Sequence, residues 1–510
     1  MKLIPSNIVG PCRGNQCIRS AQLLHVIIIG FMKIATFEVR KIIVTTWAFI
    51  EKPPKVIGKA ISLIPINLNI NKPGTFKNFG KWLFSMQSNN PDALRTALPG
   101  GCNLLLIDHY GLNHTYLKSL RNWADRIAVI DDLANRNYDA DILIDQTLGR
   151  ESSDYDDWVP NNCILLTGTG YALLRPEFSE IRMKRQKQRN KFEPPLNILV
   201  SMGAADALGI TRHVVSGLMQ VDLDMRVKIL AGSSRDLELE ELARRYPAIE
   251  LLAEVNNVED YLSETDVAIG AAGTSVWERC CLGVPSLIYI IADNQFMIGQ
   301  QIRSHRSARV YQWNDTISAQ TVSEHIADFL SDKKKLTEFS INSAKICDGF
   351  GVKRACSYLE QMFNNDEKMI TLRRINETDM KIILDWQREA GIRAYSRNPA
   401  IPSAEEHHRW FSTRVNDSTR VTEIILYDME PCGMVRLDPL RNGDLEVSIF
   451  ISAKFHRKGV GTAALAQIRR YMPDTNYCAE IHPANTASLN LFISAGYLKQ
   501  GDNFVSRPIN

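Results

Sequence analysis

Ala268-Ile-Gly-Ala-Ala-Gly-Thr-Ser-Val-Trp-Glu278 is the stretch that decides the fold, and it continues through Leu282-Gly-Val-Pro285. A short apolar strand ends in a turn of small residues, and a helix is expected to begin near Thr274. Glycines let the backbone approach a diphosphate closely, and a helix N-terminus presents unpaired N–H groups to it. A simple tight strand–helix turn fits the same spacing and stays open as an alternative. Both interpretations predict one βα unit of a parallel sheet.

Similar units lie on both sides of this stretch. Leu196-Asn-Ile-Leu-Val200 and Arg226-Val-Lys-Ile-Leu-Ala231 precede it, and Ser286-Leu-Ile-Tyr-Ile290 follows it. Nearer the N-terminus, the apolar runs 103–108, 126–132 and 141–145 each end in an acid. Buried strands that alternate with helices predict doubly wound parallel sheets, with ligands at the carboxyl ends of the strands. We therefore expect a Rossmann-like domain at 1–190, atypical over residues 1–60, and a second Rossmann-like domain at 191–365.

The pattern changes after a polar joint, Asn364-Asn-Asp-Glu-Lys368. Residues 370–510 mix helices with alternating strands, of which Leu445-Glu-Val-Ser-Ile-Phe-Ile451 is the clearest. The predicted fold class is therefore α/β: a GT-B-type pair of doubly wound parallel-sheet domains, followed by an α+β domain.

Composition limits the possible functions. The 510 residues carry 60 basic and 57 acidic side chains, a net charge of +3, which gives no electrostatic signature of nucleic-acid binding. The ten cysteines show no metal-type spacing, and we expect reduced thiols, no metal site and a cytoplasmic location. The apolar run 23–32 is too short to span a bilayer, so we expect no membrane partner.

Several motifs resemble, in order, the UDP-sugar hydrolase family of pseudaminic acid biosynthesis. The segment 270–285 resembles its nucleotide signature, 201–206 its first glycine-rich loop, and 293–295 its acidic-Asn-Gln motif. The segments 107–112 and 129–134 resemble its N-domain strand ends, and 171–178 resembles its interdomain region. The resemblance covers about residues 80–345 and implies a GT-B fold that cleaves UDP from UDP-2,4-diacetamido-2,4,6-trideoxy-β-L-altropyranose.

The resemblance also implies roles for individual residues. Glu278 would bind the ribose, and the residues near the diphosphate would be Ser201, Gly203, Gly273, Thr274 and Ser275. Asn294 and Gln295 would reach the sugar, and Tyr110 would line the sugar pocket from the facing domain. Structural roles are open beside these, with Asp108 or Asn294 as a helix cap and Arg175 with Glu177 as an ion pair.

One motif departs from that family. Its catalytic loop reads G-x-G-H-x-x-R followed by Cys or Ser, and the closest text here is Arg13-Gly-Asn-Gln-Cys-Ile-Arg-Ser20. The arginine and serine align, whereas Gln16 stands at the position of the catalytic histidine. An imidazole exchanges protons near neutral pH, and a glutamine amide does not. His25 and His109 are the nearest candidates for a substitute base.

Residues 370–510 carry a second signature. Phe455-His-Arg-Lys-Gly-Val-Gly-Thr462 enters a helix, and its Gly-x-Gly loop presents backbone N–H groups to a pyrophosphate. With the ending Asn485-Thr-Ala-Ser-Leu-Asn-Leu-Phe-Ile-Ser-Ala-Gly-Tyr497, it resembles the GNAT superfamily of acetyltransferases. The acetyl-CoA-binding residues are then Arg457, Lys458, Gly459, Gly461, Thr462 and Asn485.

Acetyl transfer needs a group that takes a proton from the attacking amine. Glu446, on the strand before the loop, is the candidate base, and a surface strand residue is the alternative. The superfamily's tyrosine acid falls at Phe492, which leaves Tyr497 as the substitute acid.

The opening of this domain is similar to the pathway acetyltransferase that acts on a UDP-4-amino-4,6-dideoxy sugar. That similarity implies that Arg388, His407 and Trp410 contact the nucleotide sugar. The alternative is that Trp386 and Trp410 are core residues.

The two units favour a bifunctional enzyme of pseudaminic acid biosynthesis that serves flagellin or surface-polysaccharide glycosylation. It would acetylate the 4-amino sugar with acetyl-CoA as co-substrate and then hydrolyse UDP from the product. A GT-B glycosyltransferase with an acetylating tail is one alternative. An acetyltransferase whose first unit only binds UDP-sugar is another, and Gln16 favours it.

Overall fold

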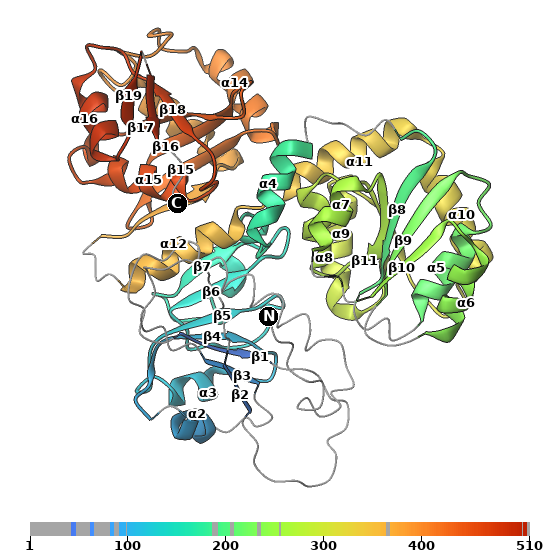
Figure 1. Ribbon diagram of the computed structural model, residues 1–510. Coiled ribbons are helices and arrows are strands. Elements are labelled where there is room, and N and C mark those ends of the chain that lie inside the picture. The colour runs from blue at the N-terminus through green and yellow to red at the C-terminus, as the bar shows by residue number, and fades with distance from the viewer. Residues whose placement is uncertain are drawn as a thin grey trace. The chain divides into compact units, whose positions relative to one another are not determined.

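The computed structural model describes residues 42–46, 62–65, 82–85, 91–97, 99–185, 192–203, 209–231, 236–253, 255, 257–363, 368–501 and 503–506. The described residues up to Gly349 form one compact unit, and those from Phe350 onward form a second (Figure 1). Gln16 and His25 lie outside the described residues.

Among the described residues, the first sheet has seven strands in the order β2-β3-β1-β4-β5-β6-β7, and every neighbouring pair except β2–β3 is parallel. The three acid-terminated apolar runs form β4, β5 and β6, whose side chains are largely buried. The elements are β1 (Ile42–Thr46), β2 (Ser62–Pro65), β3 (Trp82–Ser85), α2 (Pro91–Ala97), β4 (Cys102–Asp108), α3 (His114–Ser119), β5 (Ala124–Ile130), β6 (Ile142–Asp145), η1 (Ser152–Tyr155), β7 (Ile164–Thr167) and η2 (Thr169–Tyr171).

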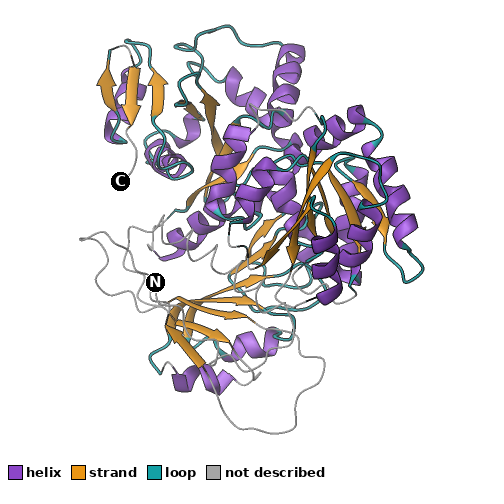
Figure 2. Cartoon of the chain, turned by 45° about the vertical axis from the view of Figure 1, so that its right-hand side comes forward, coloured by secondary structure: helices purple, strands orange, loops and turns teal. Residues whose placement is uncertain are grey.

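The second sheet has six parallel strands in the order β10-β9-β8-β11-β12-β13. Because successive strand side chains face opposite sides, Ile198 and Val200 enter one core with α5, α6 and α10, whereas Leu199 enters another with α4, α7, α8 and α9. Helices therefore cover both faces of this sheet (Figure 2). The elements are α4 (Pro176–Arg185), β8 (Leu196–Ser201), α5 (Ile210–Leu218), β9 (Met225–Ala231), α6 (Leu237–Arg245), β10 (Ile249–Ala253), α7 (Val258–Glu264), β11 (Val267–Ala271), α8 (Ser275–Cys281), β12 (Ser286–Ile290), η3 (Asp293–Gln295), α9 (Phe296–Ser304), β13 (Arg309–Gln312), α10 (Ala319–Leu330) and α11 (Lys333–Ile346).

The second unit is built on a mixed sheet in the order β14-β15-β16-β17-β18-β20-β19, in which β17 and β18 are the parallel neighbours. α12 packs in this unit, although the expected nucleotide-binding domain extends to residue 365. The elements are α12 (Gly351–Phe363), β14 (Ile370–Arg374), η4 (Glu377–Asp379), α13 (Met380–Arg388), α14 (Ala404–Asn416), β15 (Val421–Tyr427), β16 (Glu430–Pro439), β17 (Leu445–Ile451), η5 (Ala453–Phe455), α15 (Val460–Arg469), β18 (Tyr477–Glu480), α16 (Thr486–Ser494), β19 (Leu498–Gln500) and β20 (Asn503–Ser506).

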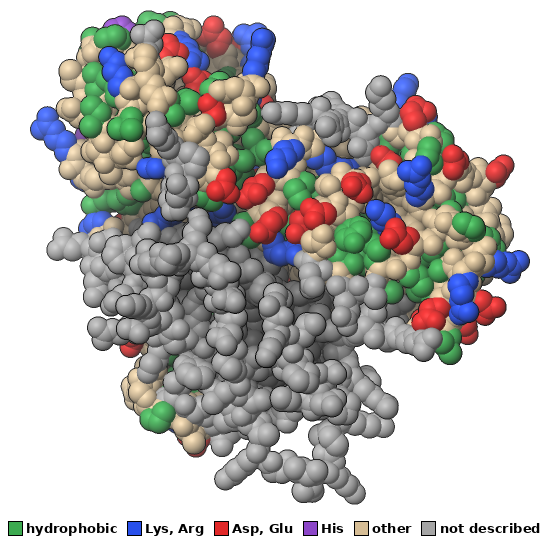
Figure 3. Space-filling model, in the orientation of Figure 1, with side chains coloured by type: hydrophobic (Ala, Val, Ile, Leu, Met, Phe, Trp, Pro, Cys, Tyr) green, Lys and Arg blue, Asp and Glu red, His purple; other side chains and the backbone are tan. Residues whose placement is uncertain are grey.

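Two sheets that are parallel apart from the β2–β3 pair, followed by a mixed sheet, confirm the predicted fold class. Among the described residues, none of the helices has both the length and the apolar character that a bilayer crossing requires. On the face seen in Figure 3, acidic and basic side chains are interspersed over the described surface.

Candidate functional site

The residues expected to bind UDP lie at the carboxyl ends of neighbouring strands in the second sheet. β8 and β11 are paired with Ser201 opposite Gly270, so the turn after Ser201 and the turn at Gly273 leave the sheet side by side. Gly203 has φ +102°, a conformation that favours glycine. The backbone N–H groups of Val276 and Trp277 bond back to Gly273 and Thr274 and close the first turn of α8, which contains Ser275 and Glu278.

A buried arginine side chain forms hydrogen bonds with the residues around this turn. The guanidinium of Arg279 donates to the Ala271 carbonyl at 2.7 Å and to the Ser275 hydroxyl at 3.4 Å. A Cβ on Gly270 would lie 2.6 Å from that guanidinium and 2.7 Å from the Ser201 carbonyl oxygen. Gly270 is therefore needed for close packing, which is distinct from any ligand contact.

The acidic-Asn-Gln motif forms η3, directly after β12 at the same edge of the sheet. Gln295 is the N-cap residue of α9, and its side-chain oxygen accepts from the Ile291 backbone N–H at 3.1 Å. Asn294 is exposed, and its side chain lies near the hydroxyl of Tyr110, where it opposes the rise in the pKa of that hydroxyl. Asn294 is therefore not the cap of α9, and it meets the residue expected to face the sugar.

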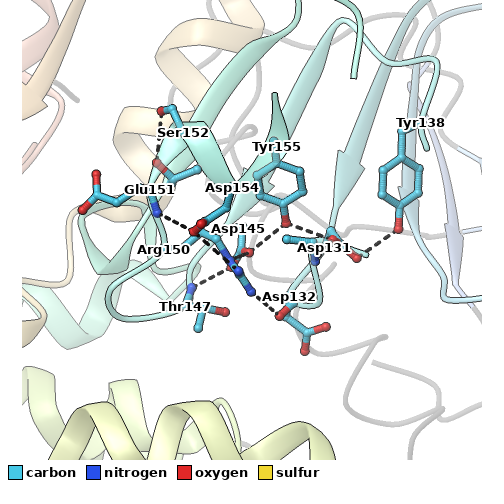
Figure 4. Close-up of polar contacts among 12 residues, drawn as sticks. Asp131, Asp132, Tyr138, Asp145, Thr147, Arg150, Glu151, Ser152, Asp154 and Tyr155 are labelled. Atoms are coloured by element: carbon cyan, nitrogen blue, oxygen red, sulfur yellow. Dashed lines mark hydrogen bonds and ion pairs between the residues drawn. The ribbon is translucent and has the colours of Figure 1, made fainter. Parts of the chain in front are cut away.

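A buried polar network lies at the carboxyl ends of β5 and β6 in the first sheet (Figure 4). Tyr155 donates toward Asp131 at 2.9 Å and Asp145 at 2.8 Å, and Tyr138 donates to Asp131 at 2.9 Å. Arg150 bonds Asp145 through Nε at 2.6 Å. The network connects the carboxyl ends of β5 and β6 through Asp131 and Asp145.

One expected structural role is not the one observed, and another expected ion-pair residue has an additional partner. Asn113 is the N-cap of α3, so Asp108 does not cap that helix. Burial and the nearby carboxylates of Asp132 and Asp131 raise the pKa of Asp108 to about 7. Arg175 pairs with Glu259 of α7, a partner that the sequence did not indicate.

In the second unit, the parallel strands β17 and β18 separate soon after they meet. Their register covers Leu445 with Tyr477 and Glu446 with Cys478, whereas β17 pairs with β16 along its whole length. From Val447 onward, the edge of β17 that faces β18 is therefore not paired with β18. An extended ligand with amide groups of its own can hydrogen-bond to that edge.

The loop after β17 leads into α15 through a left-handed turn. Gly459 has φ +75° and is the N-cap residue, and Arg457, Lys458 and Gly459 are exposed at the start of the ten-residue helix. Gly461 lies against Leu491, which is 3.0 Å from the position a Cβ would take. Thr462 follows in the first turn of α15. Asn485 caps α16 by accepting from the Ser488 N–H at 3.0 Å.

The candidate base Glu446 is held by an arginine from another segment. Arg397, on the loop between α13 and α14, bonds Glu446 on β17, with one N–O distance of 3.4 Å, and Glu480 on β18 at 2.5 Å. The Arg397 side chain is 69% exposed, whereas Glu446 is 19% exposed. Glu446 is therefore engaged in an ion pair at the point where β17 and β18 diverge.

The other expected residues of this unit lie in different environments. The His407 ring is buried, and Nε2 lies 2.8 Å from the Met380 carbonyl. Trp410 is half-buried beside His407, and Arg388 is exposed at the end of α13. Trp386 is buried against Phe450, as in the core alternative.

Tyr497 is also buried, with its ring edge-on to Phe492, and burial raises the pKa of its hydroxyl. Its predicted role as an acid stays a prediction. Within the described ranges there is no group of three or more His, Cys, Asp and Glu side chains placed to hold a metal ion.

Comparison with known proteins distinguishes the parts of the chain. Residues 369–497 match the family model described as acetyltransferase (GNAT) domain. These residues form a GNAT domain. The diverging strands β17 and β18 and the glycine turn into α15 thus belong to the GNAT domain, and the match confirms the expected C-terminal GNAT domain.

Three relatives extend the comparison. An uncharacterized protein of Methanocaldococcus jannaschii is 24% identical over 445 residues, which cover 81% of this chain and 84% of that protein. The spore coat polysaccharide biosynthesis protein SpsG of Bacillus subtilis is 21% identical over 52% of this chain and 78% of its own length. The UDP-2,4-diacetamido-2,4,6-trideoxy-beta-L-altropyranose hydrolase of Campylobacter jejuni is 27% identical over 183 residues, 35% of this chain. The chain spans 63% of that hydrolase.

Among solved structures, MurG of Acinetobacter baumannii is similar with a TM-score of 0.39 and 15% identity, over 53% of this chain and 76% of MurG. Partial homology to the hydrolase and to SpsG, together with the GNAT domain, fits the expected fusion. The chain is thus similar in its first part to proteins named for UDP-sugar hydrolysis and polysaccharide biosynthesis, and it carries a C-terminal GNAT acetyltransferase domain.

Two groups of residues were missed by the sequence reasoning. The network of Asp131, Asp145, Arg150 and Tyr155 had a partial signal, because an acid ends each of the apolar runs there. Arg397 had no signal, since an exposed loop arginine looks like any solvated charge until its partners are known.

Proposed function

We propose that the chain is a bifunctional sugar-nucleotide enzyme that acetylates the 4-amino group of a UDP-4-amino-4,6-dideoxy sugar and then hydrolyses UDP from the product. The observation that carries the UDP-sugar part is the register of β8 and β11, with Ser201 opposite Gly270. It brings two glycine-containing turns, Gly203 and Gly273, to one edge of the sheet. The similarity to the Campylobacter jejuni hydrolase supports the substrate class.

In the acetylation step, the amine nitrogen attacks the thioester carbon of acetyl-CoA and the carbon–sulfur bond breaks. Glu446 accepts the proton that the amine loses. Its ion pair with Arg397 is open to solvent on the arginine side, and such pairs contribute little to stability, so a substrate ammonium can replace the guanidinium. The thiolate leaves with its electron pair without an acid, because it is a fair leaving group near neutral pH.

In the hydrolysis step, a water oxygen forms a bond to the anomeric carbon as the bond between that carbon and the phosphate oxygen breaks. UDP leaves with the electron pair. Glu278 would accept the ribose hydroxyls, and Asn294 and Gln295 would hold the sugar. Tyr110 would contact it from the first sheet, which the closeness of its hydroxyl to the Asn294 side chain supports.

A second candidate function is a GNAT acetyltransferase whose first unit binds the UDP-sugar without cleaving it. The specific observation in its favour is Gln16, which stands where the resembled family has its catalytic histidine.

The test is a mass-spectrometric assay of the full chain with acetyl-CoA and the UDP-4-amino-4,6-dideoxy-altrose derivative. Acetylated UDP-sugar that passes on to free sugar and UDP supports the bifunctional enzyme. Acetylated UDP-sugar that accumulates intact supports the binding unit, and hydrolysis gained by Gln16→His would then identify the missing group. No acetylation at all would contradict the assigned acceptor.

A further inference from the structure

Hydrolysis by this chain needs a proton acceptor other than Gln16. His109 is close in sequence to Tyr110, but its Nδ1 accepts the Gly111 backbone N–H at 2.7 Å. Burial lowers the pKa of His109 to about 4, so the imidazole is neutral at pH 7 and has little affinity for a proton. His109 is therefore a poor substitute base.

Tyr110 and Asp132 form a better-placed pair. They follow β4 and β5, which are parallel neighbours with Asp108 opposite Ile130. The Tyr110 hydroxyl lies 2.9 Å from both Oδ1 and Oδ2 of Asp132. The Tyr110 side chain is 43% exposed, whereas Asp132 is half-buried behind it. A proton can therefore pass from an exposed hydroxyl to a carboxylate further inside.

Both members of the pair are held in position. Arg136 donates to the Tyr110 carbonyl, and its guanidinium lies 5.5 Å from the centre of the Tyr110 ring. Arg150 donates from Nη2 to the Asp132 carbonyl at 2.9 Å while its Nε bonds Asp145. The buried network thus fixes the Asp132 backbone, and Figure 4 shows the Asp132 carboxylate pointing away from the network.

The charged groups around Asp132 favour proton uptake near neutral pH. Burial raises the pKa of its carboxyl to about 6, against the opposing hydrogen bond from Tyr110. The carboxylates of Asp131 and Asp145 raise the pKa of Asp132 further, and the guanidinium of Arg150 lowers it. Asp108, at the end of β4, is a third carboxylate that interacts with Asp132. A carboxyl with such a pKa is ionised at pH 7 and still binds a proton well enough to serve as a base.

We propose that Asp132, acting through the hydroxyl of Tyr110, is the proton acceptor for the hydrolytic water in place of the family's histidine, an inference that rests on the proposed hydrolysis. As the water oxygen bonds the anomeric carbon, its proton goes to the Tyr110 oxygen and the Tyr110 proton goes to Asp132. UDP departs with the electron pair of the broken bond. Asp132 then returns the proton to solvent.

The test measures UDP release from UDP-2,4-diacetamido-2,4,6-trideoxy-β-L-altropyranose by the full chain between pH 4.5 and 9. Asp132→Asn keeps an acceptor for the Tyr110 hydroxyl but binds no proton, and Tyr110→Phe removes the relay. We expect each to lower kcat about 10²–10⁴-fold, with KM nearly unchanged for Asp132→Asn, whose side chain is not placed in contact with the sugar. The unchanged chain should lose activity as the pH falls through about 6, and Asp132→Asn should lack that acid limb.

The matched control is Asp125→Asn, near the amino end of β5, the strand that Asp132 follows, where Asp125 accepts from Asn103 at 2.8 Å. It should leave kcat and the pH profile unchanged. Asp132→Glu, which retains a carboxyl group, should recover part of the lost rate, and thermal unfolding separates loss of fold from loss of chemistry. The inference would be overturned if Asp132→Asn kept kcat within a few-fold of the unchanged chain, or if it still lost activity as the pH falls through about 6. Either result would leave the proposed hydrolysis itself standing. No UDP release by the unchanged chain would overturn the proposed hydrolysis and this inference together.

Discussion

The guanidinium of Arg354 on α12 is paired with the carboxylate of Glu423 on β15, and neither side chain has any exposed surface. One of their contacts joins Nε to Oε2 at 3.1 Å. Lys353, the preceding residue, donates to the Arg470 and Tyr471 carbonyls at 2.8 and 2.7 Å, just beyond the end of α15. α12 is therefore anchored to the GNAT unit although it precedes the residues that match the family model.

Arg354→Ala should strongly destabilise the C-terminal unit. Removing one partner of a buried ion pair leaves an uncompensated charge, which costs about 3–5 kcal/mol. Hydrogen exchange of peptides from β14 to β17, measured under increasing urea, would report the loss locally. Lys381→Ala breaks an exposed pair with Asp385 and is the control, expected to change stability by less than about 0.5 kcal/mol. Equal losses of stability from Arg354→Ala and Lys381→Ala would show that the buried ion pair contributes no more to stability than the exposed one.

Glu446→Gln should slow acetyl transfer with little effect on acetyl-CoA binding. A glutamine fits the same space and can hydrogen-bond Arg397, but it cannot take the amine proton, so kcat should fall about 10²–10⁴-fold. Release of CoA thiol, followed with a colorimetric reagent, gives the rate. Glu480→Gln removes the other carboxylate bonded to Arg397 and should leave kcat within a few-fold. A larger loss from Glu480→Gln than from Glu446→Gln would point to Glu480 as the base.

The sequence could predict those elements that depend only on a local pattern of residues. Apolar runs that end in an acid became β4, β5 and β6, and the glycine turns after β8 and β11 lie where parallel strands present ligands. The loop from Phe455 to Thr462 enters α15 as its Gly-x-Gly spacing indicated.

Contacts between distant residues could not be predicted in the same way. Arg354 and Glu423 are separated by 69 positions, and Arg397 and Glu446 by 49. Periodicity tells which side chains are buried, but it does not tell which buried polar groups meet. The hydroxyl of Tyr155, bonded to two carboxylates, follows from the order of β5 and β6 in the sheet.

Gly270→Ala should weaken UDP binding through the turn that it supports. The new Cβ would lie 2.7 Å from the Ser201 carbonyl oxygen, which belongs to the backbone and must shift, and such overpacking costs about 1–3 kcal/mol. Because Ser201 and the Gly273 turn leave adjacent strands, both arms of the expected diphosphate site would move. Calorimetric titration should show at least about a tenfold loss of UDP affinity, with a smaller loss for uridine. Unchanged UDP affinity would show that this turn is not part of the UDP-binding site.

Asp132→Asn should stabilise the first unit at pH 8 and leave its stability nearly unchanged at pH 4. The folded-state pKa of about 6 lies above the value of about 3.9 expected when unfolded. The folded chain therefore binds more protons between these values, and stability from this group falls as the pH rises from about 4 to about 6. Two pKa units correspond to at most about 3 kcal/mol, reduced by solvent access to the half-buried carboxylate. Thermal unfolding of both chains at the two pH values measures the difference, with Asp125→Asn as the control. A gain of the same size at pH 4 and pH 8 would mean that Asp132 is not a strained, proton-binding carboxylate, and the proposed relay would lose its physical basis.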